Sequence, residues 1–447
     1  MTERLFGTDG IRGKANVYPM NAEIALQVGR AAGHYFSQDD RPHTSLIGKD
    51  TRKSCYMLES ALTAGLCSMG VNVDLVGPLP TPGVSYIMRS LRADAAIMIS
   101  ASHNAYEDNG IKFFGPDGFK LPDEVEDEIE QLVTGSAIDN QRPTGSKVGW
   151  VKRIDDATGR YIEYAKSTFP KGMRLDGFKI VVDSANGAMY KVGPNALREL
   201  GAEVISLGDS PNGININDMC GSTHPEAMQA RVKAEGADLG VAFDGDGDRV
   251  VFADHHGELL DGNAVISIMG VDLLERNALP TKTLVTTIMA NGGLANAIKP
   301  FGGKILHTRV GDRYVVEAMR EGGMLLGGES SGHIIMLDHN TTGDALITAL
   351  QMLAIMIRKE QSISELASVY VAMPEAHTSI PLNGESKPEQ DILDAITKRV
   401  ETELKGKGRV VIRPSGTEPI VRVMVQHESQ SDADTLVQQL TDEVKAL

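Results

Sequence analysis

Residues 179–208 read KIVVDSANGAMYKVGPNALRELGAEVISLG, and the order of patterns in this stretch decides the fold. An apolar segment over 179–183 runs into a polar turn that ends at Gly187. Helical residues follow over 192–200, and a second strand-like segment covers 202–208. A strand, a turn, a helix and another strand in this order are typical of a β-α-β unit with parallel strands. The stretch therefore predicts a mostly parallel sheet covered by helices.

The same order of patterns occurs in two other parts of the chain. One copy consists of strand 46–52, helix 56–69 and strand 71–77, and the other of strand 283–293, helix 294–298 and strand 304–311. Internal repetition of this kind indicates structurally similar units. Three similar α/β domains are therefore expected in a chain whose 447 residues allow about two to four domains.

The C-terminal part has a different pattern. Pro374, Pro381 and Pro388, together with the turn at 383–384, indicate a linker. Beyond it lie a helix over about 390–404, strands over 410–414 and 420–425, and a final helix with Leu436, Leu440, Val444 and Leu447 on one face. A small α+β domain is expected here. The four expected domains are 1–154, 155–255, 256–371 and 372–447.

Composition and charge exclude several classes of protein. The chain has 44 basic and 60 acidic side chains, and its net charge of −16 argues against a general nucleic-acid or anionic-membrane surface. The longest apolar stretch, 345–357, is shorter than the ~20 residues of a membrane span and contains Thr348 and Gln351, so we expect a buried helix. Three cysteines without a C-x-x-C pair, and a start without an apolar leader, favour the cytoplasm.

A cluster of acids lies in VAFDGDGDRVVFAD, residues 241–254. In extended backbone, Asp244, Asp246 and Asp248 would point to one side, and the intervening glycines would allow the unusual dihedral angles of a tight loop. Three carboxylates without His or Cys favour Mg²⁺ or Mn²⁺. An EF-hand is excluded, because its sixth position would be Arg249 instead of glycine. The alternative is a solvated acidic turn.

A second polar loop follows the apolar segment 95–99. Ser102 stands at the end of this expected strand, where open α/β sheets bind their ligands. The functional interpretation makes Ser102 a nucleophile or phosphate carrier, with Lys112 close to the phosphoryl group. The alternative is a Ser/Asn-rich turn whose side chains cap backbone groups.

Residues 328–332, GESSG, match the G-x-S-x-G pattern of hydrolases. That pattern requires a helix after the serine, whereas the next residues predict a strand, which excludes the hydrolase interpretation. Glu329, Ser331 and His333 are suited to hydrogen bonds with a polyhydroxy ligand. An ordinary glycine-rich hairpin is the alternative.

The segment 410–425 contains a candidate phosphate site. Arg413, Ser415, Gly416 and Thr417 offer a guanidinium group, two hydroxyls and backbone N–H groups, and Arg422 follows on the next strand. Such residues also occur in plain turns. The chain has no G-x-x-x-x-G-K-[ST] loop, so it is not a P-loop nucleotide enzyme.

Basic residues lie in or beside these loops despite the negative net charge. Because salt limits the reach of charges to ~8 Å, local residues decide the potential of the cleft. We expect a cationic cleft formed by Arg12, Arg52, Lys112, Arg249, Arg309, Arg413 and Arg422.

Taken together, five motifs resemble the α-D-phosphohexomutase superfamily, and within it the branch that acts on glucosamine phosphates. They occur in the order that the family shows and extend over essentially the whole chain. The motifs are FGTDGIRG (6–13), SASHN with DNGIKFF (100–114), DGDGDR (244–249), GGESSGH (327–333) and RPSGTEP (413–419). The glycine at 332 and the motif at 6–13 favour the glucosamine branch.

The resemblance implies four domains around a central cleft, three of them related. It also implies a role for each site residue. Ser102 would be carried phosphorylated, and Asp244, Asp246 and Asp248 would bind Mg²⁺ together with that phosphate. Glu329 and Ser331 would recognise sugar hydroxyls, and Arg413, Ser415, Gly416, Thr417 and Arg422 would hold the phosphate that does not react. Lys112, His333, Arg249 and Arg12 would assist the transfer.

The activity implied by the resemblance is the interconversion of glucosamine 6-phosphate and glucosamine 1-phosphate. Phosphorylated Ser102 would form a 1,6-bisphosphate that turns around in the cleft, and glucosamine or glucose 1,6-bisphosphate would be the activator. The product would feed the synthesis of UDP-N-acetylglucosamine and cell-wall precursors. The expected partner is a small sugar phosphate, without nucleic acid or membrane, and the chain is expected to be a monomer or homodimer.

Two alternatives remain. One is a phosphomannomutase or phosphoglucomutase. The other is a non-catalytic sugar-phosphate binding protein on the same fold, which the intact Ser102 and aspartates disfavour.

Overall fold

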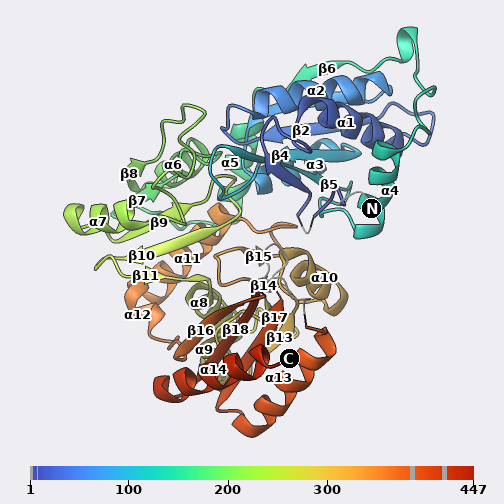
Figure 1. Cartoon of the computed structure of the whole chain (residues 1–447). Helices are drawn as coiled ribbons and strands as arrows, with labels where there is room; N and C mark the ends of the chain where they lie inside the picture. Colours follow the sequence, from blue (N-terminus) through green and yellow to red (C-terminus); the bar gives the residue numbers. More distant parts are fainter. Residues whose placement is uncertain (1–3, 8, 383–387, 415–419) are drawn as a thin grey trace.

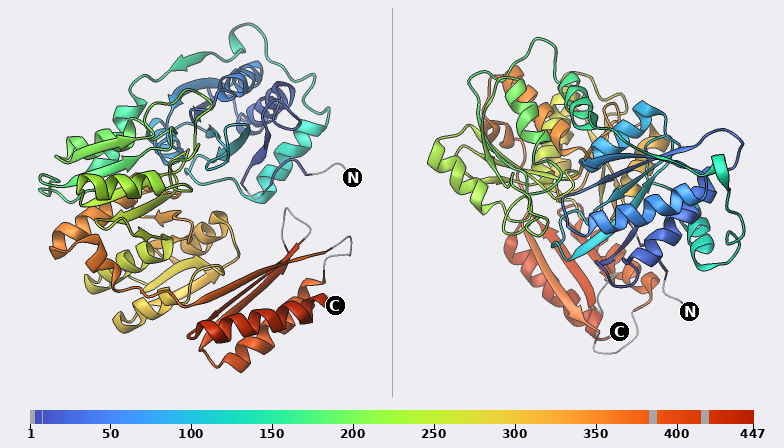
Figure 2. Two further views of the ribbon diagram at one scale, coloured as in Figure 1. Left: turned by 60° about the vertical axis from the view of Figure 1, so that its left-hand side comes forward. Right: turned by 90° about the horizontal axis from the view of Figure 1, so that it is seen from above.

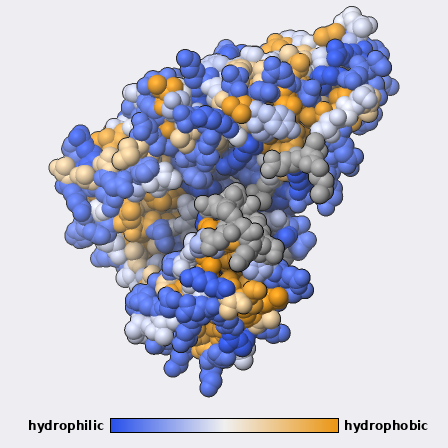
Figure 3. Space-filling model, in the orientation of Figure 1, coloured by the Kyte–Doolittle hydropathy of each residue, from blue (hydrophilic) through white to orange (hydrophobic). Residues whose placement is uncertain are grey.

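The computed structural model describes residues 4–7, 9–382, 388–414 and 420–447, and its four sheets follow one another along the chain (Figure 1). We call the parts built on these sheets the first to fourth units. The expected fold class, three related α/β units and a smaller α+β unit around a central cleft, is confirmed. The space-filling view shows the molecule hollowed between its upper and lower parts (Figure 3). None of the described helices is long and apolar enough to cross a membrane.

The first unit is a six-stranded mixed sheet with the strand order β1-β5-β4-β2-β3-β6. Strands β2, β3 and β4 are parallel, and β5 runs antiparallel to β4. The elements are β1 (Ile11–Lys14), α1 (Ala22–Phe36), β2 (Thr44–Lys49), α2 (Cys55–Ser68), β3 (Asn72–Pro78), α3 (Thr81–Leu91), β4 (Ala95–Ile99), β5 (Asp108–Phe114), α4 (Asp123–Thr134), the 3-10 helix η1 (Gly145–Lys147) and β6 (Val151–Arg153).

The second unit has a five-stranded sheet with the order β11-β10-β9-β7-β8. Strands β7, β8 and β9 are parallel, and β10 runs antiparallel to β9. The elements are α5 (Ala157–Ser167), β7 (Lys179–Asp183), α6 (Val192–Glu199), β8 (Glu203–Leu207), α7 (Glu226–Glu235), β9 (Leu239–Phe243), β10 (Val250–Asp254) and β11 (Leu259–Leu260).

The third unit repeats this arrangement with the order β13-β12-β14-β15, in which the last strand is again antiparallel. Its elements are α8 (Gly262–Glu275), β12 (Thr283–Thr287), α9 (Gly293–Ile298), the 3-10 helix η2 (Lys299–Phe301), β13 (Lys304–Thr308), α10 (Asp312–Gly322), β14 (Leu326–Gly328), β15 (Ile334–Met336), α11 (Ala345–Lys359) and α12 (Ile363–Ala367). The predicted β-α-β repeats are therefore present in all three units.

The fourth unit is an antiparallel sheet with the order β16-β18-β17, and its two helices pack on the sheet (Figure 2). The elements are β16 (Glu375–Pro381), α13 (Gln390–Leu404), β17 (Gly408–Pro414), β18 (Ile420–His427) and α14 (Gln430–Lys445). This agrees with the α+β unit expected from the sequence.

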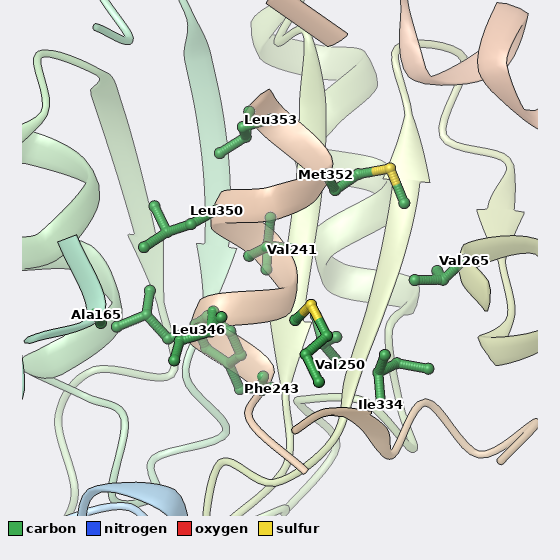
Figure 4. Packing of buried hydrophobic residues seen from close by; sticks show 14 of the residues in the cluster. Ala165, Val241, Phe243, Val250, Val265, Ile334, Leu346, Leu350, Met352 and Leu353 are labelled. Carbon is green, nitrogen blue, oxygen red and sulfur yellow. The ribbon is translucent and has the colours of Figure 1, made fainter. Parts of the chain in front are cut away.

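Helix α11 joins the second and third units. It contacts α5 and β10 on one side and α8 on the other. Leu346 and Leu350 are fully buried, and Figure 4 shows them close to Ala165 and to Val241 of β9. Asp344 is the N-cap of the helix, and its carboxylate accepts a hydrogen bond from the backbone N–H of Ile347 (2.9 Å). The apolar stretch noted in the sequence is therefore a buried helix, as predicted.

We predict that Leu350→Ala lowers the free energy of unfolding by about 2–5 kcal/mol, because the truncation leaves a cavity in this core. Leu447→Ala is the control, since that side chain is 60% exposed and should change stability by about 0.5 kcal/mol or less. Chemical denaturation followed by circular dichroism measures both. Equal free energies of unfolding for the two variants would contradict the conclusion that α11 forms part of the core shared by the second and third units.

Candidate active site

Three of the loops singled out in the sequence occupy the same position in three sheets. Each joins the last parallel strand to the antiparallel strand beside it: β4 to β5, β9 to β10, and β14 to β15. The three loops meet where the first, second and third units face one another. Ser102 Oγ donates a hydrogen bond to Asp244 Oδ2 (2.6 Å), and His333 Nδ1 lies 3.6 Å from Asp248 Oδ1.

The loop of Ser102 is held in an unusual conformation. Ser102 is 1% exposed and has a φ of 51°, in the left-handed region that non-glycine residues rarely adopt. Its N–H donates to Ser100 Oγ (2.9 Å), and Ser100 Oγ in turn donates to Asp50 Oδ2 (2.6 Å). A strained residue that its surroundings hold in place is typical of functional sites.

The acidic loop reaches its geometry by a tight turn and not by the extended backbone that the spacing suggested. Asp244 Oδ1 accepts hydrogen bonds from the backbone N–H groups of Asp248 and Arg249, both at 3.1 Å. Only Gly247 has a positive φ (72°). Gly245 is required for another reason, since a Cβ there would lie 2.5 Å from the carbonyl oxygen of Ser102. The expectation that both glycines serve unusual dihedral angles is therefore wrong for Gly245.

The three aspartates meet the requirements of a site for a hard divalent cation. Carboxylate oxygens of Asp244, Asp246 and Asp248 all lie within 4.8 Å of one another, and all three side chains are buried. Asp246 Oδ1 and Asp248 Oδ1 are buried and accept no hydrogen bond from any residue that the structure describes. Burial, followed by the neighbouring Asp248 and Asp246, raises the pKa of Asp244 well above its usual value. A bound cation would relieve this repulsion.

Lys112 is the cation closest to the aspartates among the described residues. Its Nζ lies 3.0 Å from Asp246 Oδ2 and 3.2 Å from Asp9 Oδ2, and the side chain is 1% exposed. Burial lowers the pKa of Lys112, but Asp246 and Asp9 outweigh it, so the pKa is raised. Lys112 therefore keeps its proton at neutral pH.

Three residues that sequence reasoning missed extend this network of charges. Asp9 forms ion pairs with Arg12 and Lys120 as well as with Lys112. Lys120 Nζ also lies 2.5 Å from Asp312 Oδ2, which joins the first unit to α10 of the third. Asp9 stands within the motif 6–13, which was the one sequence signal for it. No sequence pattern indicated Lys120 or Asp312, because the residues that they contact are distant in the sequence.

Arg249 and His103 lie on the other side of Ser102. Arg249 Nη1 donates to His103 Nδ1 (3.2 Å), and Ser102 Oγ lies 3.3 Å from the same nitrogen. Burial and the neighbouring Arg249 lower the pKa of His103 to about 4, so the ring is neutral at physiological pH. His103 Nδ1 accepts the hydrogen bond from Arg249 and orients that side chain, while the Ser102 hydroxyl proton is donated to Asp244.

The loop of Glu329 and Ser331 is attached to the acidic loop. The N–H of Val250 donates to the carbonyl of Gly332 (3.1 Å), which places the loop beside Arg249. Glu329 is half-buried and Ser331 is exposed. His333 is buried, and its Nε2 accepts from the N–H of Gly343 (3.2 Å), so its Nδ1 carries the proton toward Asp248.

Arg413 and Arg422 lie on β17 and β18 in the sheet of the fourth unit. Arg413 lies directly opposite Arg422 in the β17–β18 pair, and its Nε is buried without a hydrogen-bond acceptor in the part of the chain that the structure describes. Two guanidinium groups facing each other favour an anion between them. Ser415, Gly416 and Thr417 lie outside the described residues. Within those residues, no hydrogen bond or ion pair joins Arg413 to the aspartates.

The expected cationic cleft is only partly correct. Lys112 and Arg12 both form ion pairs with Asp9, so carboxylates already offset part of their charge. Arg52 is 0% exposed and binds backbone carbonyls, so it belongs to the interior. Arg309 stacks over the ring of Tyr314 at 4.0 Å and lines a cavity of about 640 Å³ between α10 and the start of α4.

Comparisons with known proteins agree with this architecture. The family of phosphoglucomutase/phosphomannomutase matches with all four of its domains: α/β/α domain I over 3–138, domain II over 159–257, domain III over 261–372 and the C-terminal domain over 359–443.

Curated relatives cover almost the whole chain. Phosphoglucosamine mutase of Citrifermentans bemidjiense is 56% identical over 96% of this chain and 95% of its own. The phosphoglucosamine mutase of Syntrophotalea carbinolica is 53% identical over 100% and 98% of the two chains.

Solved structures share the fold. A phosphoglucomutase/phosphomannomutase family protein from Burkholderia thailandensis has a TM-score of 0.82 at 25% identity and covers 99% of this chain and 96% of its own. N-acetylphosphoglucosamine mutase of Aspergillus fumigatus, in complex with GlcNAc-6P and magnesium, has a TM-score of 0.66 at 20% identity and covers 98% and 95%. The chain therefore belongs to the phosphoglucomutase/phosphomannomutase family and, within it, to the phosphoglucosamine mutases.

Proposed function

We propose that Ser102 carries the phosphoryl group that interconverts glucosamine 6-phosphate and glucosamine 1-phosphate. The observation that supports this most directly is the 2.6 Å hydrogen bond from Ser102 Oγ to Asp244, which joins residues of two units. It puts a hydroxyl beside three carboxylates that fit a divalent cation, as phosphoryl transfer requires.

The reaction has two transfers. In the first, the bond between phosphorus and Ser102 Oγ breaks, a bond forms to the free hydroxyl of the sugar phosphate, and that hydroxyl loses its proton. The resulting 1,6-bisphosphate turns around. In the second, its other phosphoryl group returns to Ser102, and the sugar oxygen regains a proton. Glucosamine or glucose 1,6-bisphosphate would serve as activator by loading Ser102.

Asp244, Asp246 and Asp248 would hold Mg²⁺, which when bound supplies positive charge that offsets the charge of the transferred group. Protonated Lys112 faces the same oxygens, and Arg249 lies beside Ser102 through His103. These fixed cations would stabilise the negative charge that develops on Ser102 Oγ as the phosphoryl group leaves. The buried cluster also excludes water, which would otherwise accept the phosphoryl group.

Substrate recognition would be divided between the third and fourth units. Glu329 and Ser331 would bind the sugar hydroxyls, and His333, next to Asp248, is the candidate for proton transfer. Arg413 and Arg422, together with Ser415, Gly416 and Thr417, would bind the phosphate that does not react. We also propose that the four domains meet at about residues 154, 255 and 371.

The experiment that tests the substrate is a panel of glucosamine, glucose and mannose 1-phosphates assayed with glucose 1,6-bisphosphate. We expect kcat/KM for glucosamine 1-phosphate to be at least about tenfold higher than for the other two, because binding the amino group requires a matched polar site. A preference for mannose or glucose phosphate would favour a phosphomannomutase or phosphoglucomutase instead.

We predict that Ser102→Ala abolishes mutase turnover, because the variant has no oxygen to carry the phosphoryl group. Intact-mass spectrometry after incubation with glucose 1,6-bisphosphate should show a phosphorylated wild-type chain and no phosphorylated variant. Ser90→Ala, an exposed serine of the same unit, is the control and should behave as the wild type. Turnover by Ser102→Ala at the wild-type rate would reject the covalent route.

Removal of divalent metal should reduce turnover by about a hundredfold or more, since the buried aspartates then oppose the incoming phosphate. Treatment with EDTA, followed by titration with Mg²⁺, measures the loss and its recovery. Isothermal titration of Mg²⁺ into Asp246→Asn should show weaker binding than into the wild type. Full activity in EDTA would exclude a role for the aspartates as a metal site.

A further inference from the structure

Two side chains from different units hold the backbone of the Ser102 loop. Arg52, which follows β2 in the first unit, donates through Nη2 to the carbonyl oxygens of Ser102 and Asn104, both at 2.9 Å. Asn217, in the loop between β8 and α7 of the second unit, donates through Nδ2 to the same two oxygens at 2.9 and 3.0 Å. Each carbonyl therefore accepts one hydrogen bond from each unit.

Asp50 holds the guanidinium group of Arg52 in position. Arg52 Nε donates to Asp50 Oδ2 (2.8 Å), and Asp50 Oδ2 also accepts from Ser100 Oγ. Arg52 Nη1 donates to the carbonyls of Ala105 and Asp108, so this one guanidinium group binds four carbonyl oxygens around the loop. The arginine is 0% exposed.

The loop needs such support because of its backbone conformation. The left-handed conformation is unfavourable for a residue with a Cβ, and Ser102 has this conformation with a φ of 51°. Fixing the carbonyls of Ser102 and Asn104 fixes the Ser102–His103 and Asn104–Ala105 peptide planes, one before and one after the pair His103–Asn104. With those planes set, Ser102 Oγ points at Asp244.

Gly245 makes room for the contact. A Cβ at this position would lie 2.5 Å from the Ser102 carbonyl oxygen and 2.9 Å from Asn217 Nδ2. The acidic loop, the Ser102 loop and Asn217 therefore pack at a distance that only glycine allows.

We infer that Arg52 and Asn217 form a carbonyl clamp that positions Ser102 for phosphoryl transfer, with Asn217 as a positioning residue from the second unit. Because the second unit also carries the three aspartates, Asn217 sets the position of the serine relative to them. The inference rests on the proposed role of Ser102.

Asn217→Gly tests the clamp. Asn217 itself has a φ of 57°, so glycine removes the amide without adding strain. Asn217→Asp keeps the size and shape of the side chain but replaces the Nδ2 donor by a carboxylate oxygen, which cannot donate to the two carbonyls. Asn215→Gly is the matched control, since among the described residues that side chain bonds within its own loop, to the N–H of Asn212 and the carbonyl of Ser210.

We expect kcat of both Asn217 variants to fall about tenfold or more, with KM for the sugar phosphate within about twofold of the wild type, because a displaced nucleophile slows the transfer and not the binding. The rate at which glucose 1,6-bisphosphate phosphorylates Ser102, followed by intact mass, should fall by the same factor. The Asn215→Gly control should keep wild-type values.

Hydrogen exchange of the backbone amides of residues 101–108 gives a readout that does not depend on activity. Exchange should be faster in Asn217→Gly than in the wild type and in the control. Unchanged exchange and unchanged kcat in Asn217→Gly would overturn the clamp. A wild-type chain without mutase activity would reject the proposed function, whereas the exchange result would still decide whether the clamp exists.

Discussion

Mutual repulsion of buried carboxylates is the constraint on which this site depends. Five carboxylates, those of Asp9, Asp244, Asp246, Asp248 and Asp312, lie close to four cationic side chains, those of Arg12, Lys112, Lys120 and Arg249. Removing charges from water costs several kcal/mol each unless partners compensate. The raised pKa of Asp244 indicates that these cationic side chains do not fully offset the repulsion between the carboxylates, and a bound divalent cation would reduce it.

Repetition of one sheet explains why residues so distant in sequence meet. In each of the first three units, two parallel strands flank a central one, and an antiparallel strand pairs with the last of the three. The three functional loops are the same connection in each copy, and Figure 1 shows these sheets surrounding the centre of the molecule. The three copies of this connection differ in their residues: one carries Ser102, one the three aspartates, and one Glu329, Ser331 and His333. In the fourth unit, β17 and β18 belong to a fully antiparallel sheet, so their connection does not correspond to the other three.

The sequence predicted the repeats, the buried helix at 345–357 and the meeting of Ser102 with the acidic loop, because each rests on a local pattern or a distinctive motif. It could not predict the partners of Lys120 or Asp312, since pairing between loops depends on how the sheets face each other. The role of Asn217 was hidden for the same reason, because an asparagine in a polar loop has no periodic signal. The sequence pattern predicts an unusual backbone conformation for Gly245, whereas the structure requires glycine there because another loop packs against it. Both requirements select glycine, so the sequence alone does not distinguish them.

The division of the cores separates Ser102 and the three aspartates from Arg413 and Arg422. One continuous apolar core includes residues of the first, second and third units, whereas the fourth unit has a core of its own. Its contact with the third unit is made by amides: Gln426 accepts from the N–H of Gly292 (2.9 Å), and Asn291 accepts from the N–H of Met373 (2.8 Å). Apolar burial therefore fixes Ser102 relative to the aspartates. Arg413 is carried on a unit attached by directional polar bonds, which can be exchanged for water at little cost.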